Sequence, residues 1–141
     1  MTTTSRCVLK ALTDEARLAL QGDAMPIDRF PFRVGRESRD PNSRPSAAIL
    51  AQRRRGLPPN NDLYIRETGA EVFVSREHFQ IEPAGEGYCL VDCASTLGTW
   101  VEGRLVGTDR RGGKAPLQHG DVVILGSFRS GLIFKFLVDA G

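Results

Sequence analysis

The chain lacks any apolar run that approaches the ~20 residues of a transmembrane helix, and residues 1–6 lack the apolar core of a secretory signal. Its net charge is only +2, from 19 basic and 17 acidic residues, so no overall positive charge favours nucleic acid as a partner. Hydrophobic residues make up 40% of the 141 positions, an ordinary fraction for a globular protein. We therefore expect a single domain over residues 1–141, with its own core and with neither membrane nor nucleic acid as a partner.

Cysteine is scarce and odd in number, with Cys7, Cys89 and Cys93. If Cys89 and Cys93 share one strand, they lie roughly 13 Å apart at ~3.3 Å per residue, which is too far for a disulfide. A reduced, cytoplasmic compartment fits this pattern best. The chain also has no His/Cys cluster with metal-ligand spacing, so we expect neither a metal nor another cofactor.

Alternating apolar residues between short turn signals predict β-strands along most of the chain. The clearest alternations run through residues 30–34, where Phe30, Phe32 and Val34 share one face, and through residues 132–138. Shorter candidates are Leu63–Ile65, Phe79–Ile81, Tyr88–Val91 and Val122–Leu125. Turn signals lie at Pro83–Gly87, Glu102–Gly103, Arg111–Gly113 and His119–Asp121. Several short strands with regular turns predict an all-β sandwich of two antiparallel sheets.

Two segments are less regular. Residues 7–12 and 17–20 are compatible with a hairpin or a helix, and we favour strands. Residues 45–56 predict a short helix, because Pro45 suits a first turn and Gly56 suits the C-terminal stop.

The predicted helix lies in an arginine-rich insertion. Segment 36–66 carries seven arginines against three acidic residues, a local balance of +4. The expected organisation is N-terminal strands over residues 6–34, the insertion over residues 37–61 and the remaining strands of the sandwich over residues 62–138.

Three short segments that lie far apart in the sequence carry chemical groups of the kinds that suit a phosphate ligand. They are Val34-Gly35-Arg36, Val74-Ser75-Arg76-Glu77-His78 and Ser95-Thr96-Leu97-Gly98-Thr99-Trp100. Each lies at the end or the start of an expected strand. Together they offer a guanidinium, hydroxyls and backbone N–H groups freed by glycine turns.

In this order the segments resemble the forkhead-associated (FHA) domain, a module that binds phosphothreonine. The resemblance runs from about Phe30 to Val138, and the stretch Leu117–Gly126 is similar to the family's Leu-x-x-Gly-Asp strand. It implies an FHA-like sandwich with its binding site on the loops at one end.

The resemblance also implies roles for individual residues. Arg36 clamps the phosphate, Ser75 and Thr96 donate hydroxyl hydrogen bonds to it, and Arg76 faces the peptide. Leu97 stands where the family usually has an asparagine that hydrogen-bonds the ligand backbone. Because the phosphate-facing residues remain, we expect altered rather than lost phosphopeptide binding.

Three further residues are expected to support the binding loops. Gly98 permits the positive φ that a tight turn needs, and Gly35 supports the loop as a glycine near a turn. His78 braces the loops through hydrogen bonds and performs no chemistry.

The resemblance therefore implies a phosphothreonine-dependent adaptor whose partner is a substrate of a Ser/Thr protein kinase. A phosphate-independent scaffold that uses Leu97 and the arginine-rich insertion is the alternative. Ser75, His78 and Asp92 are the residue types of a hydrolase triad, but no Gly-x-Ser-x-Gly elbow surrounds Ser75, so we expect no enzyme. Nucleic-acid binding by residues 53–55 is a weaker alternative, since three arginines at a helix end are usually solvated.

Overall fold

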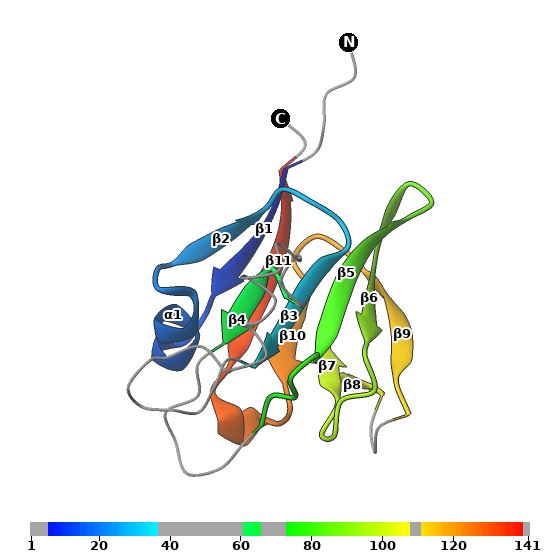
Figure 1. Ribbon diagram of the computed structural model, residues 1–141. Coiled ribbons are helices and arrows are strands. Elements are labelled where there is room, and N and C mark those ends of the chain that lie inside the picture. The colour runs from blue at the N-terminus through cyan, green and yellow to red at the C-terminus, as the bar shows by residue number, and fades with distance from the viewer. Residues whose placement is uncertain (1–5, 37–60, 66–72, 108–110, 140–141) are drawn as a thin grey trace, which may run out of the picture.

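The computed structural model describes residues 6–36, 61–65, 73–107 and 111–139. Within these ranges the chain forms two β-sheets that pack face to face, with one short α-helix at the side (Figure 1). The expected sandwich is therefore confirmed. The helix expected over residues 45–56 lies outside the described residues.

The six-stranded sheet has the strand order β2-β1-β11-β10-β7-β8, and its neighbouring strands are antiparallel. Its strands are β1 (Arg6–Ala11), β2 (Ala24–Ile27), β7 (Thr99–Val101), β8 (Arg104–Val106), β10 (Val122–Leu125) and β11 (Ile133–Asp139).

The five-stranded sheet has the order β4-β3-β5-β6-β9. Its strands are β3 (Phe32–Arg36), β4 (Leu63–Ile65), β5 (Phe79–Ala84), β6 (Gly87–Asp92) and β9 (Gly113–Leu117). β3 and β4 pair in parallel, with Val34 opposite Leu63, while the other pairs are antiparallel. This sheet is therefore mixed rather than purely antiparallel. A parallel pair needs a crossover of a dozen or more residues, and the chain between β3 and β4 is long enough to supply it.

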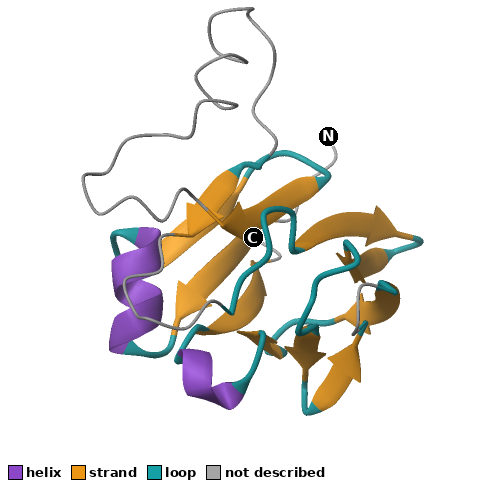
Figure 2. Ribbon diagram, turned by 60° about the horizontal axis from the view of Figure 1, so that its bottom comes forward, coloured by secondary structure: helices purple, strands orange, loops and turns teal. Residues whose placement is uncertain are grey.

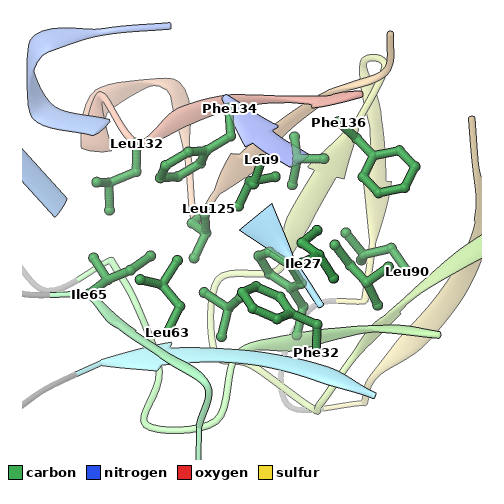
Figure 3. Packing of buried hydrophobic residues seen from close by; sticks show 14 of the residues in the cluster. Leu9, Ile27, Phe32, Leu63, Ile65, Leu90, Leu125, Leu132, Phe134 and Phe136 are labelled. Atoms are coloured by element: carbon green, nitrogen blue, oxygen red, sulfur yellow. The ribbon is translucent and has the colours of Figure 1, made fainter. Parts of the chain in front are cut away.

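The core fills the space between the two sheets. Phe134 and Phe136 on β11 face Phe32 on β3 and Leu90 on β6, and all four side chains are at most 1% exposed. Figure 3 shows these side chains between the two layers, together with Leu9, Ile27 and Leu125. Full burial of such a side chain contributes about 1.5–3 kcal/mol. The alternation that predicts the strands is thus the alternation that fills the core.

The strand expected over residues 17–20 is wrong, because these residues belong to helix α1 (Asp14–Leu20). Thr13 caps this helix, and its side-chain oxygen accepts a hydrogen bond from the Ala16 N–H at 3.1 Å. Ala16 and Ala19, three residues apart, are buried in the core. Figure 2 shows α1 and the 3-10 turn η1 (Phe128–Ser130) beside the strands.

Among the strands that have no counterpart in the sequence expectation, β2 and β9 share two features. Both lie at the edge of a sheet, and each contains a proline, Pro26 or Pro116. Proline weakens the strand pattern but is tolerated at a sheet edge, where one side of the strand needs no partner. Gly113, expected in a turn, is the first residue of β9.

The alternation predicts that Phe30 shares the buried face of Phe32 and Val34, but in the structure it does not. β3 begins only at Phe32, and Phe30 is 38% exposed. Its ring stacks on that of Tyr88 with centroids 5.6 Å apart. The alternation therefore holds only within the strand itself.

The cap of α1 gives a test of how the helix is held. Thr13→Ala should lower the free energy of unfolding by about 1–2 kcal/mol, because it removes the cap and the hydrogen bond from the Thr13 hydroxyl to the Gly131 carbonyl. Thr13→Ser, which keeps the hydroxyl, should retain most of the stability. Urea unfolding monitored by circular dichroism measures both changes, and equal losses in the two variants would contradict the role of the hydroxyl.

Candidate functional site

A pocket of about 750 Å³ lies at one end of the sandwich. It is at the end where β3 stops and β5 and β7 begin, away from the start of β1 and the end of β11 (Figure 1). The residues that line it come from the end of β3, from the segment before β5 and from the β6–β7 connection. They are Arg36, Phe73, Val74, Ser75, Arg76, Glu77, Cys93, Ala94, Thr96 and Leu97. The structure thus brings all five residues expected to face a ligand to one pocket.

Backbone hydrogen bonds join the three segments that line the pocket. The Arg36 N–H donates to the Ser75 carbonyl at 2.9 Å, and the His78 N–H donates to the Val34 carbonyl at 2.9 Å. The Cys93 N–H donates to the His78 carbonyl at 2.8 Å. The segment around His78 is therefore fixed between β3 and the end of β6.

His78 joins the two binding loops through its side chain and is fully buried. Its Nδ1 accepts from the Ser75 N–H at 3.0 Å, and its Nε2 lies 2.8 Å from the Gly98 carbonyl oxygen. Because a carbonyl only accepts, Nε2 carries the proton, and the ring is a neutral donor–acceptor bridge. Burial lowers the pKa of His78 below its usual value, outweighing the Gly98 carbonyl and the Asp92 charge, which raise it.

The two hydroxyl residues of the pocket are also linked. The Ser75 Oγ accepts from the Thr96 N–H at 3.1 Å. This leaves the proton of the Ser75 hydroxyl available to a ligand. Ser75 is half-buried and Thr96 is exposed, so both hydroxyls border the pocket from its two sides.

Asp92 organises the loop that carries Thr96, a role that the family resemblance does not imply. Its Oδ2 accepts from the Ser95 Oγ at 2.6 Å and from the Thr99 Oγ1 at 2.8 Å, and its Oδ1 accepts from the Ser95 N–H at 2.9 Å. The Ser95 Oγ in turn accepts from the Gly98 N–H at 2.9 Å. Asp92 is 3% exposed, and Ser95 and Thr99 are fully buried. The spacing Asp-x-x-Ser, typical of side-chain-closed turns, is the sequence signal that would have pointed to it.

Asn61 holds the segment before β5, which carries Ser75 and Arg76. The sequence places this residue at the end of the expected insertion. It is 3% exposed, and its Nδ2 donates to the Arg76 carbonyl at 2.8 Å. A Cβ on Gly35 would lie 2.0 Å from this carbonyl oxygen and 2.6 Å from the Asn61 Nδ2. Glycine at position 35 therefore allows the loop to approach β3.

Gly98 has two reasons to be glycine. Its φ is +87°, and a Cβ would lie 2.2 Å from the Gly107 carbonyl oxygen. Either feature alone would strain another residue at this position.

The charges in the pocket favour an anion beside Arg36. Of the described residues, none with an acidic side chain lies within salt-bridge distance of Arg36. The lining also contains Arg76 and one acidic residue, Glu77. Burial, followed by the charges of Asp92, Glu77 and Glu82, raises the pKa of Cys93 to about 11, so this thiol stays protonated at neutral pH.

Ser75, His78 and Asp92 do not have the hydrogen bonds of a hydrolase triad. Both ring nitrogens of His78 bond other partners than the Ser75 hydroxyl and the Asp92 carboxylate. No group of three or more potential metal ligands occurs in the described ranges. Nor does any helix in them have the length and apolarity needed to cross a membrane.

Comparison with known proteins identifies the family. The family model described as FHA domain matches residues 32–126. The chain belongs to the FHA domain family. No curated protein is significantly similar to it in sequence.

Solved structures share the FHA fold at low sequence identity. The FHA domain of kinase associated protein phosphatase from Arabidopsis is 18% identical, with a TM-score of 0.64 over 99% of this chain and 98% of that one. The MEK1 FHA domain, in complex with a phosphothreonine peptide of HOP1, is 16% identical, with a TM-score of 0.52 over 94% and 95%.

EmbR from Mycobacterium tuberculosis, in complex with a low-affinity phosphopeptide, is 18% identical, with a TM-score of 0.60. The match covers 99% of this chain but only 26% of EmbR, so the chain spans about a quarter of that protein. At these identities the likenesses concern the fold.

The buried His78 predicts a pH-dependent stability. The unfolded chain binds a proton at this side chain below its ordinary pKa of about 6.5, whereas the folded chain resists protonation. The stability is therefore complete above about pH 6.5 and is lost as the pH falls. Between about pH 7.5 and 5.5 the free energy of unfolding should fall by up to about 1.4 kcal/mol. Urea titrations at both pH values measure it. His119→Gln, which changes the exposed histidine, should keep the fall, and a stability that does not change with pH would contradict the assignment.

Proposed function

We propose that the protein is a phosphothreonine-dependent interaction module that binds phosphorylated segments of other proteins and catalyses no reaction. The observation that carries this proposal is the convergence of Arg36, Ser75 and Thr96 on one pocket, with two of its loops joined by the buried His78. FHA domains are protein-interaction modules. The phosphopeptide complexes of EmbR and of the MEK1 FHA domain are consistent with the same use of this fold here.

Recognition would follow from charge and hydrogen bonding alone. A phosphothreonine brings a charge of roughly −1.5 to −2 and several strong acceptor oxygens. Arg36 would supply a two-pronged guanidinium contact, and the Ser75 and Thr96 hydroxyls would donate to other phosphate oxygens. Charge-assisted hydrogen bonds contribute about 1.5–3 kcal/mol each. A few of them would reach micromolar affinity, about −8 kcal/mol, after ordering costs.

The partner would be a substrate of a Ser/Thr protein kinase, bound in the cytoplasm. The free state of Cys7, Cys89 and Cys93 supports a reducing compartment. Arg76 would face the bound peptide from the edge of the pocket, where its side chain is exposed.

A phosphate-independent scaffold is the second candidate. Leu97 is the observation that favours it, because this leucine is 41% exposed at the pocket and cannot replace the amide of the usual asparagine. The two candidates differ in whether removal of the phosphate abolishes binding.

Arg36 should dominate phosphate binding. Arg36→Ala should weaken the binding of a phosphothreonine peptide, selected from an oriented library, by about 2–4 kcal/mol, from the loss of the guanidinium contact and its charge. Arg33→Ala is the matched control, since Arg33 lies on the same strand outside the pocket and carries the same charge. Titration calorimetry measures both, and equal affinities of the wild type and Arg36→Ala would sink the assignment.

Leu97 offers a gain-of-function test. Because this side chain is exposed, Leu97→Asn should not disturb the core, and it should restore a hydrogen bond to the peptide backbone. The expected gain is about 0.5–1.5 kcal/mol in binding free energy, with an unchanged melting temperature. Leu18→Asn changes a more exposed leucine, which lies on α1 outside the pocket, and should not alter affinity. If neither the wild type nor Leu97→Asn binds any phosphopeptide, the scaffold is favoured.

A further inference from the structure

The six-stranded sheet carries a row of apolar side chains that crosses five of its strands or their ends. Strand register places Leu105 opposite Trp100, Trp100 opposite Ile124, and Ile124 opposite Ile133. The Leu12 N–H donates to the Ile133 carbonyl at 3.0 Å, which extends the row to the residue that follows β1. We call these five residues the apolar row.

The apolar row lies on the face of the sheet that points away from the core. Val123 and Leu125, which flank Ile124 on β10, belong to the core cluster between the sheets. Ile124 is only 6% exposed but does not belong to that cluster. Because successive residues of a strand point to opposite faces, Ile124 and its partners across the sheet share the outer face.

The ends of the apolar row are open to solvent. Leu12 is 39% exposed and Leu105 is 43% exposed, while Trp100 and Ile133 are half-buried. Four strand spacings of ~4.8 Å make the row about 19 Å long. Ala16 and Ala19 of helix α1 are buried in the core between the sheets. Their packing therefore does not explain the apolar side chains of the row, which lie on the outer face.

A second row, beside the first, carries positive charge. Lys10 lies directly opposite Lys135, which lies opposite Val122. In the part of the chain that the structure describes, neither lysine has an acidic side chain within salt-bridge distance. The carboxylate of Glu102 accepts from the Val122 N–H at 2.7 Å and is thus held by the backbone. Like charges directly opposite each other are unfavourable, and an acidic ligand would relieve this repulsion.

The apolar row is continuous with the candidate phosphate pocket. The Trp100 Nε1–H donates to the Gly126 carbonyl at 3.2 Å, and the Gly126 N–H donates to the Gly98 carbonyl at 3.0 Å. A Cβ on Gly98 would lie 2.6 Å from the Cδ1 of Leu105. Leu97, the neighbour of Gly98, lines the pocket. One end of the row therefore adjoins the loop that would hold the phosphothreonine.

We propose that the apolar row, together with Lys10 and Lys135, binds a second segment of the phosphorylated partner. This segment carries apolar and acidic residues and continues along the partner chain from the phosphothreonine. The apolar residues cover the row, and the acidic residues pair with the two lysines. About six extended residues span the length of the row. The inference rests on the proposed function, since the phosphothreonine places the segment beside the row.

Two synthetic probes test the inference. Both are peptides of about 20 residues with a central phosphothreonine, so that each arm is long enough to cross the row in either direction. In one probe the arms alternate leucine with glutamate, and in the other they alternate serine with glutamate. Fluorescence anisotropy measures the affinity of each probe for the whole chain and its variants.

The leucine probe should bind the wild type about tenfold more tightly than the serine probe, because it covers the exposed leucines. The double variant Leu12→Ser/Leu105→Ser should remove most of this preference. Leu18→Ser, a leucine on α1 that is 76% exposed and outside the row, should keep it. Lys10→Gln/Lys135→Gln should weaken the leucine probe severalfold, and more at low salt than at high salt. Urea unfolding of each variant confirms that the fold is intact.

Three outcomes would overturn the inference. If both probes bind with equal affinity and depend on phosphate and on Arg36, the second surface is wrong while the proposed function stands. If binding is unaffected by removal of the phosphate and by Arg36→Ala, the proposed function fails, and a shared partner fails with it. If sedimentation shows a wild-type dimer that Leu12→Ser/Leu105→Ser dissociates, the row binds a second copy of the chain instead.

Discussion

The pocket depends on the two hydrogen bonds that the imidazole of His78 makes. It accepts from the Ser75 N–H and donates to the Gly98 carbonyl, and so it fixes the distance between two loops that are far apart in the sequence. The Ser75 hydroxyl can then accept from the Thr96 N–H, which aligns the two hydroxyls. A protonated ring could not accept from Ser75, so the geometry requires the neutral form that burial favours. A buried polar group with both of its hydrogen-bonding positions filled rigidifies its surroundings.

The rest of the loop architecture follows the same rule of complete hydrogen bonding. Asp92 is buried with its carboxylate bonded to Ser95 and Thr99, and Asn61 is buried with its amide bonded to the Arg76 carbonyl. Buried polar groups without such partners would destabilise the fold. These networks therefore hold the loops in one conformation before any ligand arrives, which lowers the ordering cost of binding.

The sequence predicts this fold where apolar alternation is strong and misses it where another signal dominates. Val122–Leu125 is found as a strand with the predicted bounds. The strands that contain Pro26 and Pro116 are missed, because their stability comes from neighbouring strands rather than from their own pattern. At the site, the resemblance named five residues that line the pocket: Arg36, Ser75, Arg76, Thr96 and Leu97. It could not name Asn61 or Asp92, whose positions follow from hydrogen bonds within the folded structure.

Leu97 connects the pocket to the outer face of the sheet. An asparagine at this position reads the peptide backbone, which is the same in every partner, whereas a leucine contacts side chains. Under the proposed function, the exchange would therefore shift discrimination from the hydrogen bond beside the phosphate to apolar surface near it. This surface continues through Leu105 into the apolar row, since Leu105 packs next to Gly98. Under the two proposals, the phosphate would supply charge-dependent affinity, and the apolar surface would supply selectivity between phosphorylated partners.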